Sequence, residues 1–138
     1  MDIQFINQKE WGIKTQIFRV CSGRLKKFLP ETDGVLNVIF TDDTYIHELN
    51  KKYRKKDKPT DVLSFSYIEE TGIAINGLIG EIYISVPTAE RQAPEYGNTL
   101  SDELKKLFVH GFLHIFGYDH ETDEEYKEMS EVEKEMLS

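Results

Sequence analysis

The spacing of apolar residues changes several times along this chain, and each spacing predicts one kind of element. Short alternating or continuous apolar runs predict four β-strands, over residues 3–7, 35–40, 62–67 and 79–86. Apolar residues three and four apart predict helices over residues 13–29, from a cap at 41–43 to about 53, and over 100–116. Two more helices are expected, a short one after Pro87 that ends at about Glu90 or Ala93 and a longer one after Thr122. Strands that alternate with helices, with one strand pair reversed, indicate an α/β or α+β fold. We expect a mixed four-stranded sheet with one antiparallel strand, packed with about five helices.

Residues that favour helix ends mark several of these boundaries. Thr99 is suited to cap the helix over residues 100–116, and Gly117 follows its last periodic residue, as helix-ending glycines do. Thr122 and Glu125 have the spacing of a capping box, which predicts that the last helix begins there. The strands at 62–67 and 79–86 are separated by a short connection, so we expect them to be antiparallel neighbours.

The same periodicity predicts which side chains point inward. We expect inward positions on the first, second and last helices at Ile13, Ile17, Val20, Cys21, Phe28, Tyr45, Ile46, Leu49, Tyr126, Met129, Val132 and Met136. The run at 35–40 is typical of a strand buried on both faces. His47 falls on the other side of its helix, where we expect an exposed and inert side chain.

Length and composition limit the class of protein. The chain has 138 residues, of which 39% are hydrophobic and 30% charged, a profile of soluble globular proteins. No apolar run approaches the roughly 20 residues that cross a bilayer, and the first residues lack the basic and apolar segments of a secretion signal. Cys21 is the one cysteine, which excludes an internal disulfide and fits an ordinary core position in a reducing cytoplasm. We therefore expect one domain over residues 1–138, located in the cytoplasm, with no membrane or disulfide partner.

The charge is unevenly distributed along the chain. The net charge is −8, but residues 119–138 contain nine acidic and two basic side chains, which leaves a net of −1 for the rest. Residues 51–58, here called the basic segment, contain six cationic side chains: Lys51, Lys52, Arg54, Lys55, Lys56 and Lys58. Such a run is usually a solvated loop, and it can also bind a polyanion such as a nucleic acid.

Three of the four histidines lie within eleven residues, in the string HGFLHIFGYDH. His110 and His114 are four residues apart on a predicted helix, so their imidazoles project from one face. Gly117 lets the chain leave the helix and turn, and His120 can then supply a third ligand. Three neutral nitrogen ligands favour zinc, copper or nickel, and they leave one tetrahedral position open, as in a catalytic zinc site where bound water becomes acidic.

The spacing of these histidines is that of the metzincin proteases, but one essential residue differs. The protease pattern H-E-x-x-H-x-x-G-x-x-H uses its glutamate as the general base. Here that position is Gly111, which can take no proton, and Met129 and Met136 are expected in the core rather than in a methionine turn. Peptide hydrolysis is therefore disfavoured.

Several motifs together resemble one known family. HGFLHIFGYDH, the upstream stretch LNKKYRKKDKPTDVLSFSY and the strand IGEIYIS resemble the YbeY-type bacterial rRNA maturation factors, over roughly residues 35–137. The resemblance implies a metzincin-like domain with one Zn²⁺ held by His110, His114 and His120. It also implies a single-strand-specific endoribonuclease that acts in maturation of the 16S rRNA 3′ end and in ribosome quality control. Its implied partners are single-stranded RNA and the small ribosomal subunit with its proteins.

The resemblance also assigns a role to one residue of the basic segment. The family's characteristic arginine falls on Arg54, which we expect, with His114, to be catalytic. A guanidinium can make two hydrogen bonds to the reacting phosphate and stabilise charge in the transition state. The alternative is that Arg54 pairs with Asp57 or Asp61 and only fixes the loop.

Other positions are open to more than one interpretation. Tyr53 and Tyr67 can stack on unpaired bases or simply pack in the protein, and Asp119 can orient a ligand imidazole or shape the turn. Ser66 and Glu81 stand where the family commonly has proline and aspartate, and neither is a proposed ligand.

The expected reaction is metal-assisted phosphodiester hydrolysis, and its general base is not evident. No residue of the histidine motif supplies a base, so either metal hydroxide or the 2′-hydroxyl of the RNA would take that role. One rival hypothesis is a ribosome-assembly factor that keeps zinc for stability. Another is a hydrolase of a peptide or a small phosphoester.

Overall fold

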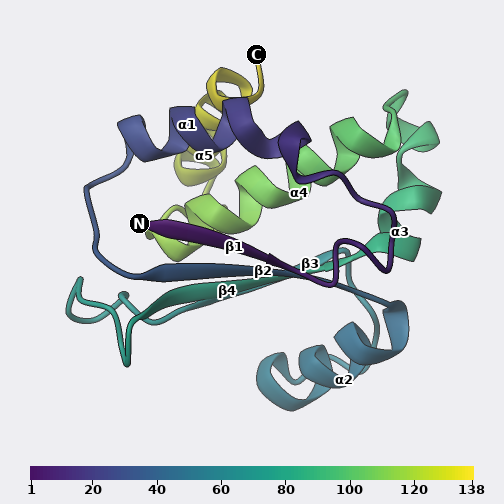
Figure 1. The fold of residues 1–138 in the computed structure, drawn as a ribbon, viewed down its shortest axis with the longest axis horizontal. Helices are drawn as coiled ribbons and strands as arrows, with labels where there is room; N and C mark the ends of the chain where they lie inside the picture. Colours follow the sequence, from purple (N-terminus) through teal and green to yellow (C-terminus); the bar gives the residue numbers. More distant parts are fainter.

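The computed structural model describes residues 1–138, and a single mixed sheet forms its centre (Figure 1). The strand order is β1-β2-β4-β3, with β1 and β2 parallel, β2 and β4 parallel, and β3 antiparallel to β4. The bounds of the strands are Asp2–Ile6 for β1, Val35–Thr41 for β2, Val62–Ser66 for β3 and Leu78–Ser85 for β4. The predicted mixed sheet with one antiparallel strand is therefore confirmed.

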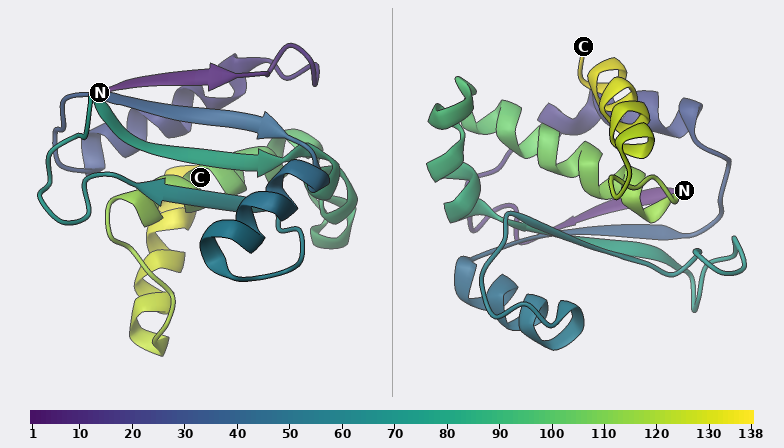
Figure 2. Two further views of the ribbon diagram at one scale, coloured as in Figure 1. Left: turned by 90° about the horizontal axis from the view of Figure 1, so that it is seen from below. Right: turned by 180° about the vertical axis from the view of Figure 1, so that it is seen from behind.

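Helices cover the two faces of this sheet unequally (Figures 1 and 2). Three helices, α1, α4 and α5, lie on one face, whereas α2 lies alone on the other. The helix bounds are Arg19–Phe28 for α1, Asp43–Arg54 for α2, Val86–Gln92 for α3, Leu100–Ile115 for α4 and Asp123–Leu137 for α5. Two 3₁₀ turns occur at Thr15–Phe18 (η1) and Pro94–Tyr96 (η2). The expected five helices are thus present, and none of them is both long and apolar enough to cross a membrane.

The hydrophobic core lies between the sheet and the three-helix layer. A cluster of 24 buried residues forms it, and aromatic rings from a 3₁₀ turn, a strand and a helix meet at its centre. The ring of Phe18 lies 5.0 Å from that of Phe108 and 6.0 Å from that of Phe40, between centroids. Large buried rings of this kind contribute much of the stability of a small domain. The histidines are not members of this cluster.

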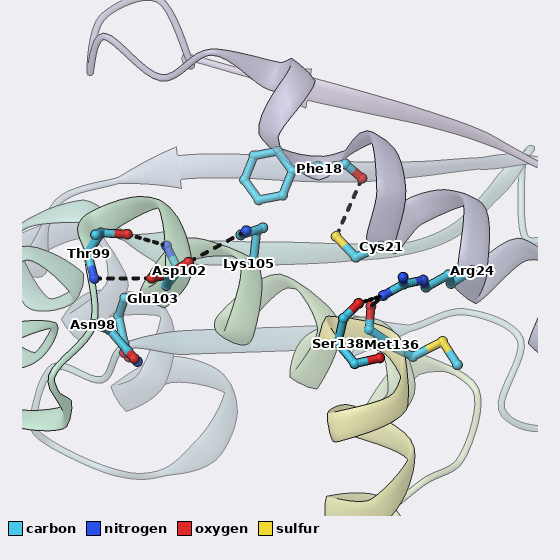
Figure 3. Close-up of polar contacts among 10 residues, drawn as sticks. All are labelled: Phe18, Cys21, Arg24, Asn98, Thr99, Asp102, Glu103, Lys105, Met136 and Ser138. Atoms are coloured by element: carbon cyan, nitrogen blue, oxygen red, sulfur yellow. Dashed lines mark hydrogen bonds and ion pairs between the residues drawn. The ribbon is translucent and has the colours of Figure 1, made fainter.

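Helix α4 is placed by polar contacts at its first turn and by close packing at its last. Thr99 and Asp102 form a reciprocal capping box, which satisfies backbone N–H groups that the helix leaves unpaired (Figure 3). A Cβ atom on Gly111 would lie only 2.9 Å from Cγ2 of Ile82 on β4, so this helix approaches the sheet more closely than another residue would allow. The predicted caps at Thr99 and at Thr122 are both confirmed.

The first helix is fixed to the last one by an arginine on α1 that reaches the end of the chain. Arg24 donates hydrogen bonds to the carbonyls of Met136 and Ser138, as Figure 3 shows. Cys21 on the same helix is buried, its thiol donates to the carbonyl of Phe18, and burial raises the pKa of that thiol. The expectation of an ordinary core cysteine is confirmed.

Four expected inward positions are wrong, and each has a geometric reason. Val20, Phe28, Tyr45 and Tyr126 are 62%, 42%, 46% and 62% exposed. The predicted helix over 13–29 begins as a 3₁₀ turn, which changes the angular phase so that Phe18, Cys21 and Leu25 face the core. Tyr45 lies on the isolated α2 and Tyr126 on the first turns of α5, beyond the body of the core.

The strand expected to be buried on both faces is buried on only one. Side chains along β2 alternate between buried and half-buried, because α2 covers only part of the second face. The remaining expectations for inward positions on α5 are confirmed, since Met129, Val132 and Met136 are all buried.

Candidate metal centre

The last turns of α4 and the loop after it bring three histidines together. His110 and His114 project from one face of α4, as their spacing predicts, and Gly117 leaves the helix with φ of +97°. His120 then turns back toward them, so that the ring centroids are 4.5 Å apart for His110 and His114, 5.5 Å for His110 and His120, and 5.0 Å for His114 and His120. One nitrogen from each ring lies within 4.8 Å of the others.

The donor set fits a single divalent transition metal. The Nε2 atoms of His110 and His114 are 3.0 Å apart. Two nitrogen ligands of one tetrahedral zinc ion would be separated by about 3.3 Å, given bonds of 2.0–2.1 Å. Burial, followed by the nearby charges of His110 and His120, lowers the pKa of His114, which favours the neutral ring that a metal ligand requires.

A glutamate that the sequence did not indicate supports the first histidine. Oε1 of Glu133 on α5 lies 2.7 Å from Nδ1 of His110, and the two side chains are 22% and 30% exposed. A hydrogen bond from Nδ1–H to this carboxylate fixes the tautomer whose Nε2 lone pair faces the other histidines. Glu133 is 23 residues away in sequence, and only the crossing of α5 over α4 reveals the contact.

Asp119 shapes the turn rather than orienting a ligand ring. Its Oδ1 accepts a hydrogen bond of 2.7 Å from the backbone N–H of His120. The same oxygen is 3.9 Å from Nδ1 of His120, which is beyond a normal hydrogen bond. Of the two interpretations of Asp119, the structure therefore shows the one that fixes the loop.

The histidines and the basic segment face a common groove. This groove has a volume of about 650 Å³, and its lining includes all three histidines together with Arg54, Lys56 and Lys58. Every side chain of the basic segment is exposed. The three cations are therefore available to an anionic ligand that also reaches the histidines.

Arg54 is held by the neighbouring strand and not by an aspartate. Its Nη2 donates a 2.6 Å hydrogen bond to the carbonyl of Ser64, and its guanidinium carbon lies 5.0 Å from the ring centroid of Phe65. The alternative expectation, pairing with Asp57 or Asp61, is therefore wrong. A guanidinium fixed in this way on β3 retains other N–H groups for an anion in the groove.

The two aspartates have other partners. Oδ1 of Asp57 lies 2.7 Å from Nε2 of His47, and that histidine is half-buried rather than exposed as expected. Asp61 lines the groove, but its Oδ1 accepts from the N–H of Val62 at 2.8 Å and its Oδ2 accepts from Gln92 at 3.0 Å. These hydrogen bonds of Asp61 fix the backbone shortly after the basic segment.

Neither of the two tyrosines proposed for base stacking lines the groove. The ring of Tyr53 is exposed and stands edge-on to Phe65, with 5.5 Å between centroids. The hydroxyl of Tyr67 donates to Glu81 at 2.6 Å, and burial together with this hydrogen bond raises the pKa of Tyr67 to about 12. Tyr67 is thus a packed residue of the sheet.

Comparisons with known proteins relate this chain to one family. The family model described as Endoribonuclease YbeY matches residues 3–138. The endoribonuclease YbeY of Aquifex aeolicus is 55% identical over 104 residues, covering 75% of this chain and 68% of that protein. The endoribonuclease YbeY of Bacillus thuringiensis is 40% identical over 146 residues, covering 98% of this chain and 93% of that protein. The solution structure of TM1509 from Thermotoga maritima is 32% identical, with a TM-score of 0.63, and the match covers 98% of this chain and 86% of that one. A family model that matches almost from end to end, and relatives at this level of identity, show that this chain belongs to the YbeY family.

Proposed function

We propose that this chain, acting as one domain, is a zinc-dependent, single-strand-specific endoribonuclease that matures the 3′ end of 16S rRNA in the cytoplasm. A role in ribosome quality control, with the small ribosomal subunit and its proteins as partners, belongs to the same proposal. The observation that carries it is the common groove, in which three histidines face Arg54, Lys56 and Lys58. The names of the relatives, endoribonuclease YbeY, support RNA as the substrate.

His110, His114 and His120 would hold one zinc ion per chain. When bound, zinc supplies a Lewis acid that polarises a phosphate oxygen and makes water more acidic. Glu133 keeps Nε2 of His110 directed at the other ligands, and the lowered pKa of the half-buried His114 favours its neutral form. The three histidines thus offer their lone pairs from fixed positions. His114 is both a ligand and an expected catalytic residue.

The basic wall of the groove would bind the RNA backbone. Lys56 and Lys58 neutralise phosphates and release counterions, which makes affinity depend on salt. Arg54 is already oriented by Ser64 and Phe65, so its remaining N–H groups can stabilise charge on the reacting phosphate without first losing side-chain freedom.

The proton of the attacking group is not taken by a residue of the histidine motif. Gly111 occupies the position of the protease base, and its contact with Ile82 leaves no room for a longer side chain. Asp61 lines the groove, but both of its carboxylate oxygens already accept hydrogen bonds, from Val62 and from Gln92. The chemical ends of the products therefore distinguish attack by the 2′-hydroxyl from attack by water.

Cleavage of an end-labelled single-stranded RNA tests the proposal. The native protein and His114→Ala are purified in parallel, since a contaminating nuclease would appear in both, and circular dichroism verifies that the variant is folded. We expect the native protein to cleave and the variant to be inactive. Equal cleavage, or none by zinc-loaded protein on ribosomal RNA, would overturn the nuclease proposal. A 2′,3′-cyclic phosphate among the products would identify the 2′-hydroxyl as the nucleophile.

Metal removal separates this proposal from a zinc-stabilised assembly factor. The protein has an apolar core of 24 buried residues, and domains with a core of this kind fold without a structural metal. We therefore expect a chelator to abolish cleavage while the far-ultraviolet circular dichroism spectrum is retained. Unfolding on chelation would instead favour the assembly factor.

A further inference from the structure

A second cavity adjoins the groove on the side of α5. It has a volume of about 380 Å³, and it shares Asp61, Val62, His110 and His120 with the groove lining. A ligand that passes the histidines can therefore extend from the groove into this second cavity without leaving the protein surface.

Two tyrosine rings are the most exposed part of the second cavity. Tyr96 on η2 and Tyr126 on α5 line it and are 64% and 62% exposed. Leu107 and Met129, both buried, supply an apolar base to the cavity. Large exposed rings beside buried apolar side chains, at a site next to polar ligands, are a recognised feature of binding sites. We call this second cavity the tyrosine cavity.

The tyrosine cavity has fewer cationic side chains than the groove. Its one lysine, Lys106, lies 3.0 Å from the buried Glu103 and 3.8 Å from the ring centroid of Tyr96. Asp61 and Glu133 also line the cavity. Because this single lysine is already paired, it attracts a phosphate less than the three cations of the groove do, whereas a flat uncharged ring can stack on tyrosine.

We propose that the tyrosine cavity binds one unpaired base of the RNA, adjacent to the phosphate at the histidines. This inference rests on the proposed function. The phosphates of the chain follow the basic wall of the groove, and the base turns away from it to stack on Tyr96 or Tyr126. Continuity through His110 and His120 places this base next to the cleavage position and makes the cavity a determinant of base preference.

The test pairs tyrosine variants with RNA that lacks single bases. Fluorescence anisotropy measures binding of the zinc-loaded protein to a labelled 2′-O-methyl oligonucleotide, checked on a gel to be intact afterward. A series of such oligonucleotides carries one abasic residue at successive positions. For the native protein we expect one abasic position to weaken binding about tenfold more than its neighbours, the size of one stacking interaction.

The variants locate that interaction. Tyr96→Ala combined with Tyr126→Ala should lose about tenfold in affinity for the complete oligonucleotide and should lose its sensitivity to the abasic position. Tyr96→Phe combined with Tyr126→Phe keeps both rings and should behave as the native protein. Tyr45→Ala, which removes another exposed tyrosine from the far face of the sheet, is the matched control and should also behave as native.

The proposal is overturned if the alanine pair remains as sensitive to the abasic position as the native protein, or if no position stands out for the native protein. Failure of the nuclease proposal is separate, since it appears as absence of cleavage in the unmodified RNA. Binding to the 2′-O-methyl series does not depend on cleavage, so the two results can be distinguished.

Discussion

Nδ1 of His110 lies 2.7 Å from Oε1 of Glu133, and this contact joins the candidate metal centre to the last helix. The carboxylate accepts from the imidazole and thereby directs the other nitrogen, Nε2, at the centre of the three histidines. Glu133 lies on α5, whose neighbouring residues Met129, Val132 and Met136 are buried in the core. The orientation of one ligand ring is therefore set by packing of a helix that contributes no ligand itself.

Replacement of Glu133 should weaken metal binding. For Glu133→Ala we expect about 10- to 100-fold lower zinc affinity, because His110 loses the partner that fixes its tautomer. Glu133→Gln keeps an accepting oxygen but not the charge, so its loss should be smaller. Competition with a chromogenic chelator measures the affinity, and Glu131→Ala on the exposed side of α5 is the control. Native affinity in Glu133→Ala would show that the contact has no part in metal binding.

Arg54→Lys should separate charge from geometry. Lysine keeps the positive charge, but it lacks the planar group that bonds to Ser64 and stacks on Phe65. We expect cleavage of single-stranded RNA to slow by about a hundredfold or more while RNA affinity changes little. Lys52→Ala, a basic-segment residue outside the groove lining, should leave the rate nearly unchanged. Equal rates for Arg54→Lys and the native protein would exclude a specific role for the guanidinium.

Two glycine replacements should change stability in opposite directions. In Gly111→Ala the new methyl group lies 2.9 Å from Cγ2 of the buried Ile82, so we expect a loss of about 1–3 kcal/mol in the free energy of unfolding. Gly23 on α1 has no atom within 4 Å of the corresponding position, so Gly23→Ala should gain about 0.5–1 kcal/mol. Urea unfolding measures both. A neutral effect of Gly111→Ala would mean that α4 can move away from the sheet at little cost.

Asp43 should make stability depend on acid pH. Burial opposes ionisation of its carboxyl, but hydrogen bonds from Ser85, Thr88 and Arg91 outweigh that effect and hold the pKa of Asp43 below its ordinary 3.8. A lowered folded-state pKa stabilises the protein above the unfolded-state pKa, and this stabilisation is lost as the pH falls through the lowered value.

The comparison of the native protein with Asp43→Asn isolates this contribution. The difference in their free energies of unfolding should be largest near about pH 7, stay nearly constant to about pH 5, and shrink toward about pH 3. Urea titrations at each pH provide the measurement. A difference that does not change over this range would contradict the assigned hydrogen bonds.

Features that depend on local spacing could be predicted from the sequence. The grouping of His110 with His114 follows from one helical turn, and Thr99 and Thr122 cap helices through residues only three positions away. The mixed sheet followed from the order of strands and the short connection before β4. The histidine pair and the two caps depend on contacts within four residues, and the antiparallel strand pair depends on one short connection.

Features that depend on how elements pack could not be predicted in this way. Val20 was misplaced because a 3₁₀ turn before α1 shifts the helical phase, which periodicity alone does not reveal. Tyr126 has helical spacing with the buried Met129, yet it lies on a turn of α5 that extends past the core. The partner of Arg54 is a backbone carbonyl, so no residue type in the sequence could have indicated it.

The separation of charge along the chain has an effect on how a polyanion arrives. The basic segment is wholly exposed, and α5, with most of the acidic residues of 119–138, lies on the opposite face of the sheet from α2. We expect this separation of charge to give the protein an electric dipole moment, so that an approaching polyanion experiences a torque as well as an attraction. The polyanion is oriented before any contact forms, and this raises the association rate at low ionic strength. Added salt shortens the Debye length and removes the gain in rate.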